Sequence, residues 1–124
     1  MIKLIQVKAD NGSGPIIGDV DLFFSPEGEA EVNIMIAPPE WRRHGYASEA
    51  LTLAMQYAIQ RFDIGKFVAK IARTNEASCK FFERHGYQRV NSEANVFGEF
   101  IYELDAGNVP SADLNIHSSF EINP

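Results

Sequence analysis

The sequence has one cysteine, no long apolar run and no excess of positive charge, and each absence excludes a class of protein. Because Cys79 has no second cysteine as a partner, we expect neither an intramolecular disulfide nor a cluster of metal-binding thiolates. No segment approaches the roughly 20 apolar residues of a membrane span. The formal net charge of -6 opposes nonspecific attraction to nucleic acid or an anionic membrane surface. We expect no nucleic acid or membrane partner, and a cytoplasmic protein, with the nucleus as an alternative.

Two further sequence patterns are missing. The chain has no Gly-x-Gly-x-x-Gly string, which argues against a Rossmann-type nucleotide binder. The three histidines, His44, His85 and His117, do not have the spacing of zinc ligands, so we expect no metal site. The sequence does not indicate an oligomeric state.

What is present is typical of one folded domain, with 45% hydrophobic and 23% charged residues in 124. Alternating and β-branched segments predict strands, Ala-rich periodic segments predict helices, and Gly, Pro and Asn clusters predict turns. The predicted elements are strands at 2–8, 16–24 and 29–37, a helix at 47–61, a strand at 66–72, a helix at 75–84, and strands at 87–90 and 96–104.

This order, β-β-β-α-β-α-β-β, predicts an α/β (α+β) domain with two helices. A strand, helix, strand run among otherwise antiparallel strands implies one parallel crossover in a mixed, mostly antiparallel sheet. We expect the domain to occupy residues 1–105 and the segment 106–124 to be a flexible tail, because it has turn formers and no clear period.

The junction between the third strand and the first helix concentrates basic residues. It reads Arg42-Arg43-His44-Gly45-Tyr46-Ala47 and follows Pro38-Pro39, which ends the strand. The first N–H groups of a helix have no intrahelical partners and attract phosphate, and Gly45 lets the backbone turn several N–H groups toward one ligand. The junction therefore indicates an anion site, and the alternative is a solvated helix start.

The third strand has two different faces, because side chains alternate along a strand. Val32, Ile34 and Ile36 form an apolar face that suits the core. The opposite face carries Glu29, Glu31, Asn33 and Met35. Its carboxylates either point toward a ligand across the sheet or form a solvent-facing strand edge.

The junction resembles the acetyl-CoA loop of the GNAT superfamily of N-acetyltransferases, whose pattern is Arg or Gln, two residues, Gly, one residue, then Gly or Ala. The segment 75–87 resembles the family's later element, an Asn that contacts the cofactor and a helix that ends in Gly and an aromatic residue. Simple N-capping is a competing role for Asn75. The sequence from Gly18 through Ile71 is similar to that of eukaryotic N-acetyltransferase 9-like proteins, and the family resemblance covers about residues 2–104.

The resemblance implies that acetyl-CoA lies between the third strand and the strand at 66–72, which separate, and that an amine attacks its thioester directly. Main-chain groups of the third strand would bind the pantetheine arm, and the junction would bind the pyrophosphate. The implied cofactor-binding residues are Met35, Ile36, Ala37, Arg42, Arg43, His44, Gly45, Tyr46, Ala47 and Asn75. The attacking amine must lose a proton, and the first candidate to accept it is Glu31, followed by Glu29.

The chain departs from the family pattern in two respects. Phe82 stands where many members carry a tyrosine that protonates the departing thiolate. Family members also begin with a strand and one or two helices. The resemblance leaves no counterpart of these elements in this sequence, so we expect an N-terminally truncated fold. The sequence therefore leaves two functions open: an N-acetyltransferase acting on a protein N-terminus, a lysine or a small amine, and a noncatalytic acetyl-CoA-binding module or inactive shortened isoform.

Overall fold

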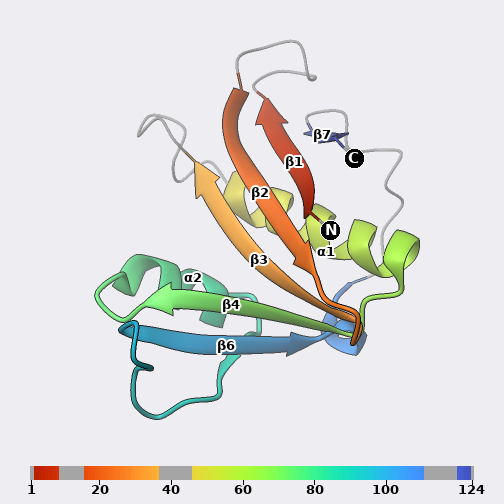
Figure 1. The fold of residues 1–124 in the computed structure, drawn as a ribbon. Coiled ribbons are helices and arrows are strands. Elements are labelled where there is room, and N and C mark those ends of the chain that lie inside the picture. Colours follow the sequence, from red (N-terminus) through yellow and green to blue (C-terminus); the bar gives the residue numbers. More distant parts are fainter. Residues whose placement is uncertain (1, 9–15, 37–45, 111–119, 124) are drawn as a thin grey trace.

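The structure is a computed structural model, and it describes residues 2–8, 16–36, 46–110 and 120–123 (Figure 1). The described elements follow the predicted order as far as the sixth strand. They are β1 (Ile2–Lys8), β2 (Ile16–Phe24), β3 (Glu29–Ile36), α1 (Tyr46–Phe62), β4 (Lys66–Ala72), α2 (Glu76–Arg84), β5 (Gln88–Arg89), β6 (Glu99–Asp105), a 3-10 helix (Ala106–Asn108) and β7 (Phe120–Asn123).

Within the described ranges, the strands form one seven-stranded sheet in the order β5-β6-β4-β3-β2-β1-β7. Every neighbouring pair is antiparallel except β3 and β4, which run parallel because α1 carries the chain from one to the other. This confirms the predicted mixed, mostly antiparallel sheet with two helices and one parallel crossover.

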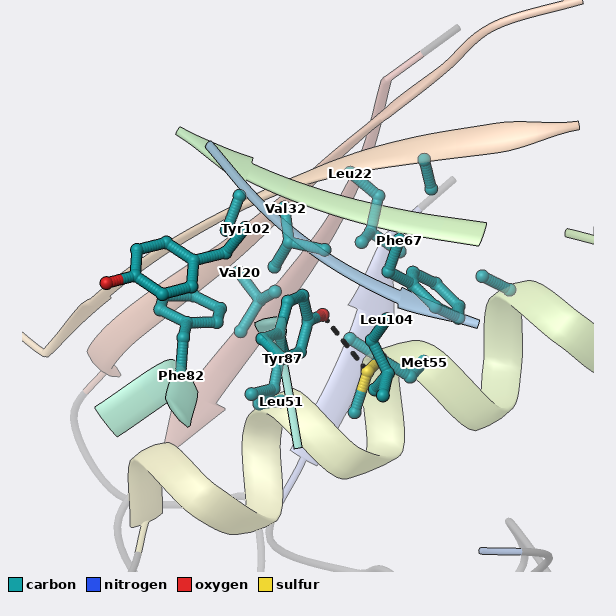
Figure 2. Close-up of a cluster of buried hydrophobic side chains, with 14 of the residues drawn as sticks. Val20, Leu22, Val32, Leu51, Met55, Phe67, Phe82, Tyr87, Tyr102 and Leu104 are labelled. Atoms are coloured by element: carbon teal, nitrogen blue, oxygen red, sulfur yellow. Dashed lines mark hydrogen bonds between the residues drawn. The ribbon is translucent and has the colours of Figure 1, made fainter. Parts of the chain in front are cut away.

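Both helices pack on the same face of the sheet. In Figure 1, α1 lies behind β1 and β2, and α2 lies behind β4. Helix and sheet side chains share one apolar core, part of which is drawn in Figure 2. Its larger buried members are Val20, Leu22, Val32, Leu51, Met55, Ile64, Phe67, Ile71, Phe82, Tyr87, Tyr102 and Leu104. No helix in the described part of the chain is both long and apolar enough to cross a lipid bilayer.

The end of the sheet where β4 begins is tied together by backbone hydrogen bonds. The turn between β2 and β3 contains Gly28, whose φ of 80° is a conformation that favours glycine. The N–H of Gly65 donates to the carbonyl of Gly28 at 2.8 Å, and the N–H of Ala106 donates to the carbonyl of Gly65 at 2.9 Å. These bonds hold the β2–β3 turn, the start of β4 and the end of β6 against one another.

Two segments of the expected tail, residues 106–124, have a described structure. Ala106 and Val109 pack against the core. Phe120–Asn123 forms β7, which pairs antiparallel with β1 from Leu4 to Val7. This pairing joins segments from opposite ends of the sequence, and local sequence patterns carry no information about such a contact. The sheet therefore extends beyond the expected boundary at residue 105.

The last hairpin is also shorter than expected. β5 has only two residues, and β6 begins at Glu99 rather than at residue 96. The side chain of Asn95 accepts hydrogen bonds from the N–H groups of Phe97 and Glu99, and Gly98 has a φ of 75°. This turn takes up residues that the apolar pattern assigned to a strand.

Candidate functional site

The sheet opens between β3 and β4. The two strands pair only at Glu29 with Lys66, Ala30 with Phe67 and Glu31 with Val68. Beyond these pairs they diverge, as Figure 1 shows. β3 remains paired with β2 as far as Ile36, and β4 remains paired with β6 along its whole length. The separation implied by the family resemblance is therefore confirmed, and in the described residues the two facing edges lack a strand partner there.

A cavity of about 130 Å³ lies in this split. It is lined by Val32, Asn33, Ile34, Lys70, Ile71, Ala72, Asn75, Ser78 and Phe82. The cavity thus meets three elements, namely the separated parts of β3 and β4 and the start of α2. Unpaired strand edges offer N–H and C=O groups that require hydrogen-bond partners, which suits an extended, amide-containing ligand.

Asn75 occupies the start of α2 and borders the split cavity. Its side-chain oxygen accepts a hydrogen bond from the N–H of Ser78 at 3.2 Å, so the N-cap role is confirmed. Ser78 lines the same cavity. The sequence interpretation did not single out Ser78, although its place three residues after the cap was the available signal.

A second, larger hollow of about 340 Å³ lies on the face of the sheet opposite the helices. It is lined by Phe23, Phe24, Ser25, Glu29, Glu31, Val68 and Lys70. We call it the outer pocket. Its aromatic rings and two carboxylates suit a ligand that combines an apolar group with an amine.

The two predicted carboxylates have different surroundings. Glu31 belongs to the last β3–β4 pair before the split, and its Oε1 lies 3.1 Å from Nζ of Lys70. Glu29 belongs to the first pair, beside Lys66, whose Nζ lies 3.4 Å from Oε1 of Glu103. Both carboxylates line the outer pocket, but Glu31 is the nearer to the split along β3.

The hydroxyls of Tyr87 and Tyr102 both donate hydrogen bonds to other side chains. Tyr87 donates a hydrogen bond to Sδ of Met55 at 3.2 Å, drawn as a dashed line in Figure 2. Tyr102 donates to Oε2 of Glu83 at 2.7 Å. Burial raises the pKa of both phenols, and for Tyr102 the bond to Glu83 adds to this. Neither residue lines the outer pocket or the split cavity, whereas Phe82 borders the split cavity.

The predicted pyrophosphate loop lies mostly outside the described residues. Arg42, Arg43, His44 and Gly45 of this loop lie outside them, as does Ala37, which the resemblance places beside the pantetheine arm. The backbones of Met35 and Ile36 belong to β3 beyond its pairing with β4, Tyr46 begins α1, and Ala47 lies in the first turn of α1.

The first turn of α1 is connected to the end of α2. Oγ of Ser48 lies 3.0 Å from Nε2 of His85, a hydrogen bond that spans the two helices. Burial lowers the pKa of His85, and the charge of Arg84 lowers it further. The start of α1, where the predicted loop ends, is thereby held against the helix that borders the split.

The chain is similar to a known protein family, to proteins of several organisms and to solved structures. The profile of the acetyltransferase (GNAT) domain matches residues 2–88. An N-acetyltransferase 9-like protein of Nematostella vectensis is 39% identical over 113 residues, which cover 86% of this chain and 57% of that protein. Alpha/beta-tubulin-N-acetyltransferase 9 of Mus musculus is 36% identical over 92 residues, covering 72% of this chain and 38% of that protein. A spermidine N-acetyltransferase chimera from Vibrio cholerae and hSSAT has a TM-score of 0.75 at 20% identity, covering 87% of this chain and 69% of the other.

The mixed sheet, its single parallel crossover and the split beside that crossover define the acyl-CoA N-acyltransferase class of fold. The chain belongs to the GNAT acetyltransferase family, and N-acetyltransferase 9-like proteins are among its relatives. It spans 57% and 38% of the lengths of the two relatives described above.

Proposed function

We propose that the chain binds acetyl-CoA in the split between β3 and β4 and transfers the acetyl group to a primary amine by direct attack. The observation that carries this proposal is the ladder that stops after three residue pairs while β4 stays fully paired with β6. The opening follows from the strand arrangement itself, and it leaves backbone groups of β3 available to a pantetheine arm. Membership in the GNAT family supports the same assignment.

The residues around the split fit this co-substrate. The unpaired edge of β3 around Met35 and Ile36 can exchange hydrogen bonds with amides of the pantetheine arm, and Asn75 borders the same cavity. Arg42, Arg43 and the N–H groups up to Ala47 would hold the pyrophosphate, as the sequence predicts. Acetyl-CoA supplies an activated acetyl thioester.

Glu31 would accept the proton that the attacking amine loses. It belongs to the last β3–β4 pair before the split and lines the outer pocket, so its carboxylate lies between the expected thioester and the space for an amine. A general base must reach the proton directly or through one water, which its exposed position allows. Glu29 is the second candidate. The thiol of CoA has an ordinary pKa of about 8.5, so it can leave as a thiolate without a proton from Phe82.

We propose a protein amine as the acceptor, because one relative is named as an alpha/beta-tubulin N-acetyltransferase. A chain N-terminus and a lysine both present an amine that the carboxylates of the outer pocket can attract. Small amines are the alternative acceptor class. The cytoplasm or nucleus remains the predicted location.

The first experiment is calorimetric titration of acetyl-CoA into the chain and into a double variant, Arg42→Ala with Gly45→Asp. We expect binding by the parent chain and loss of binding in the variant, because an added carboxylate and a lost cation both oppose the pyrophosphate. Arg61→Ala, in the last turn of α1, removes the same charge at the opposite end of the helix and serves as the control. Equal binding by the parent and the double variant would show that the loop does not hold the pyrophosphate. No binding of acetyl-CoA by the parent would exclude the proposed function.

The second candidate is a noncatalytic acetyl-CoA-binding module. The observation in its favour is that Phe82 borders the cavity while the hydroxyls of Tyr87 and Tyr102 are engaged elsewhere. Incubation with acetyl-CoA and a panel of peptide and small amines separates the two functions. CoA release that depends on an amine supports the transferase, and tight binding without release supports the binding module.

A further inference from the structure

We propose that Lys70 is a further catalytic residue, whose ammonium group faces the departing sulfur and stabilises its negative charge. The inference rests on the proposed function, since it concerns the same split and the same co-substrate. It assigns a specific side chain to a task that the ring of Phe82 cannot perform.

The position of Lys70 carries the inference. Lys70 is the single residue shared by the linings of the split cavity and the outer pocket, among the residues that the structure describes. It follows Val68, the last residue of β4 that pairs with β3, by two positions, so both side chains project from the same face of the strand. Lys70 therefore stands where the closed part of the sheet ends and the split begins.

Charge distinguishes Lys70 from the other side chains of the split. In the described part of the chain, the cavity lining consists of apolar side chains, two asparagines, one serine and Lys70. A thiolate formed in this cavity would find a single cation in its wall. Opposite charge within a few ångströms favours the ionised form of a thiol.

The charged neighbours of Lys70 come from the two strands beside β4. On β3 the nearest is Glu31, at 3.1 Å, and on β6 the residue directly opposite Lys70 is the uncharged Ile101. The other charged residues on this face of the three strands are Glu29 on β3, Lys66 on β4, and Glu99, Glu103 and Asp105 on β6. Since Lys66 pairs with Glu103, the one carboxylate paired with Lys70 is Glu31, the proposed base.

Glu31 and Lys70 have different roles in the reaction. The nitrogen lone pair of the neutral amine forms the new C–N bond, the C–S bond breaks, and its electron pair leaves on sulfur. Glu31 takes the proton from nitrogen and releases it to water. Protonation of Glu31 removes its negative charge, so the ammonium of Lys70 loses its counter-ion at the stage when the negative charge on sulfur develops.

An ordinary surface ion pair is the alternative explanation, and β4 provides a matched example of one. Lys66 also lies on the outer face of β4, four residues earlier, and pairs with Glu103 at 3.4 Å. The side chains of the two lysines have similar exposed fractions, 38% for Lys66 and 47% for Lys70. Lys66 lines neither hollow, so the two pairs differ chiefly in their distance from the split.

The test measures the thiol pKa of bound CoA, from the ultraviolet absorbance of its thiolate as the pH is raised, with desulfo-CoA as the blank. The measurement is made in Glu31→Gln, whose uncharged amide stands for the protonated base, and there we expect this pKa to lie about one unit below 8.5, a tenfold preference for the thiolate. In that background Lys70→Met should return it to about 8.5, Lys70→Arg should keep it lowered, and Lys66→Met should leave it unchanged. An unchanged thiol pKa in Lys70→Met would overturn the inference, as would an equal effect of Lys66→Met.

The same samples separate this inference from the proposed function. Calorimetry with CoA first establishes whether each variant binds, and the solvent-exposed position of Lys70 makes a folding defect in its variants unexpected. Binding with a thiol pKa that does not depend on Lys70 rejects the role of Lys70 alone. Failure of the parent chain to bind CoA rejects the proposed function and this inference together.

Discussion

The two sides of β4 show how a sheet can be opened without being broken. Toward β6, all seven residues of β4 are paired, from Lys66 to Ala72. Toward β3, only the first three are paired. Because β6 and the bonds through Gly65 hold β4 in place, the strand keeps its position after it leaves β3. An opening in a sheet can therefore form where a strand loses its pairing with one neighbouring strand, provided that its pairing with the other neighbouring strand continues.

The closed and open ends are stabilised by different means. At the closed end, Phe67 is completely buried, and its register neighbours are Ala30 on β3 and Leu104 on β6. At the open end, α2 begins with the Asn75 cap, and the contact of His85 with Ser48 joins α2 to α1. We expect changes at the closed end to affect mainly stability, and changes at the open end to affect mainly ligand binding.

The largest effect is expected from Phe67→Ala. Removal of a fully buried phenyl ring leaves a cavity and lowers the free energy of unfolding by about 3–5 kcal/mol. Urea-induced unfolding followed by circular dichroism measures this change. Phe97→Ala is the control, because Phe97 is 81% exposed, and its effect should stay within about 0.5 kcal/mol. Similar losses in both variants would contradict the assignment of the core to the closed end.

An intermediate effect is expected at Asn75, where capping and cofactor binding can be separated. Asn75→Ala removes the cap and should lower the free energy of unfolding by about 1 kcal/mol. Asn75→Asp keeps an oxygen that can accept the bond from Ser78 but has no amide N–H donor. We therefore expect the Asp variant to keep the parent stability and to bind acetyl-CoA about tenfold more weakly, the loss of one hydrogen bond. If acetyl-CoA binds the Asp variant as it binds the parent, Asn75 is a cap alone.

The smallest effect is expected from His85, through pH. The pKa of His85 is lowered in the folded state by burial and by Arg84. Near the ordinary histidine pKa of about 6.5, the unfolded chain therefore binds more protons than the folded chain. The associated stability is present above that value and is lost as the pH falls below it. In His85→Gln this part of the acid dependence should disappear, whereas Ser48→Ala should retain it. Denaturant midpoints at pH 5.0 and 7.5 measure the difference, and an equal acid loss in parent and His85→Gln would refute the prediction.

Local sequence patterns predicted most of the fold, because strand and helix periodicity depends on residues that are close in the sequence. Strand alternation placed Val32 in the core and Asn33 on the outer face, and the structure agrees. The parallel pairing of β3 and β4 followed from the order of elements. β7 could not be predicted, because its hydrogen bonds go to the first strand of the chain. The late start of β6 depends on the side-chain bonds of Asn95, which an apolar pattern does not reveal.

Candidate site residues that belong to a sequence pattern could be predicted, whereas a residue whose proposed role depends on the arrangement of the strands could not. Asn75 was predicted from the resemblance to a family motif and Glu31 from its strand face, and each lines one of the two hollows. Lys70 gave no such signal, since an alternating strand with one exposed lysine is ordinary. Its proposed role rests on its place at the end of the β3–β4 ladder, and the length of a ladder depends on contacts across the sheet.

The three-pair ladder between β3 and β4 also bears on how the molecule folds. It is the seam between two antiparallel half-sheets, and its two strands are separated in the sequence by the whole of α1. Contacts of this kind require closure of a long loop and form slowly, while hairpins form early. We expect the seam to close last during folding and its amide protons to exchange with solvent sooner than those between β4 and β6. The base of the ligand site would then be the final part of the domain to assemble.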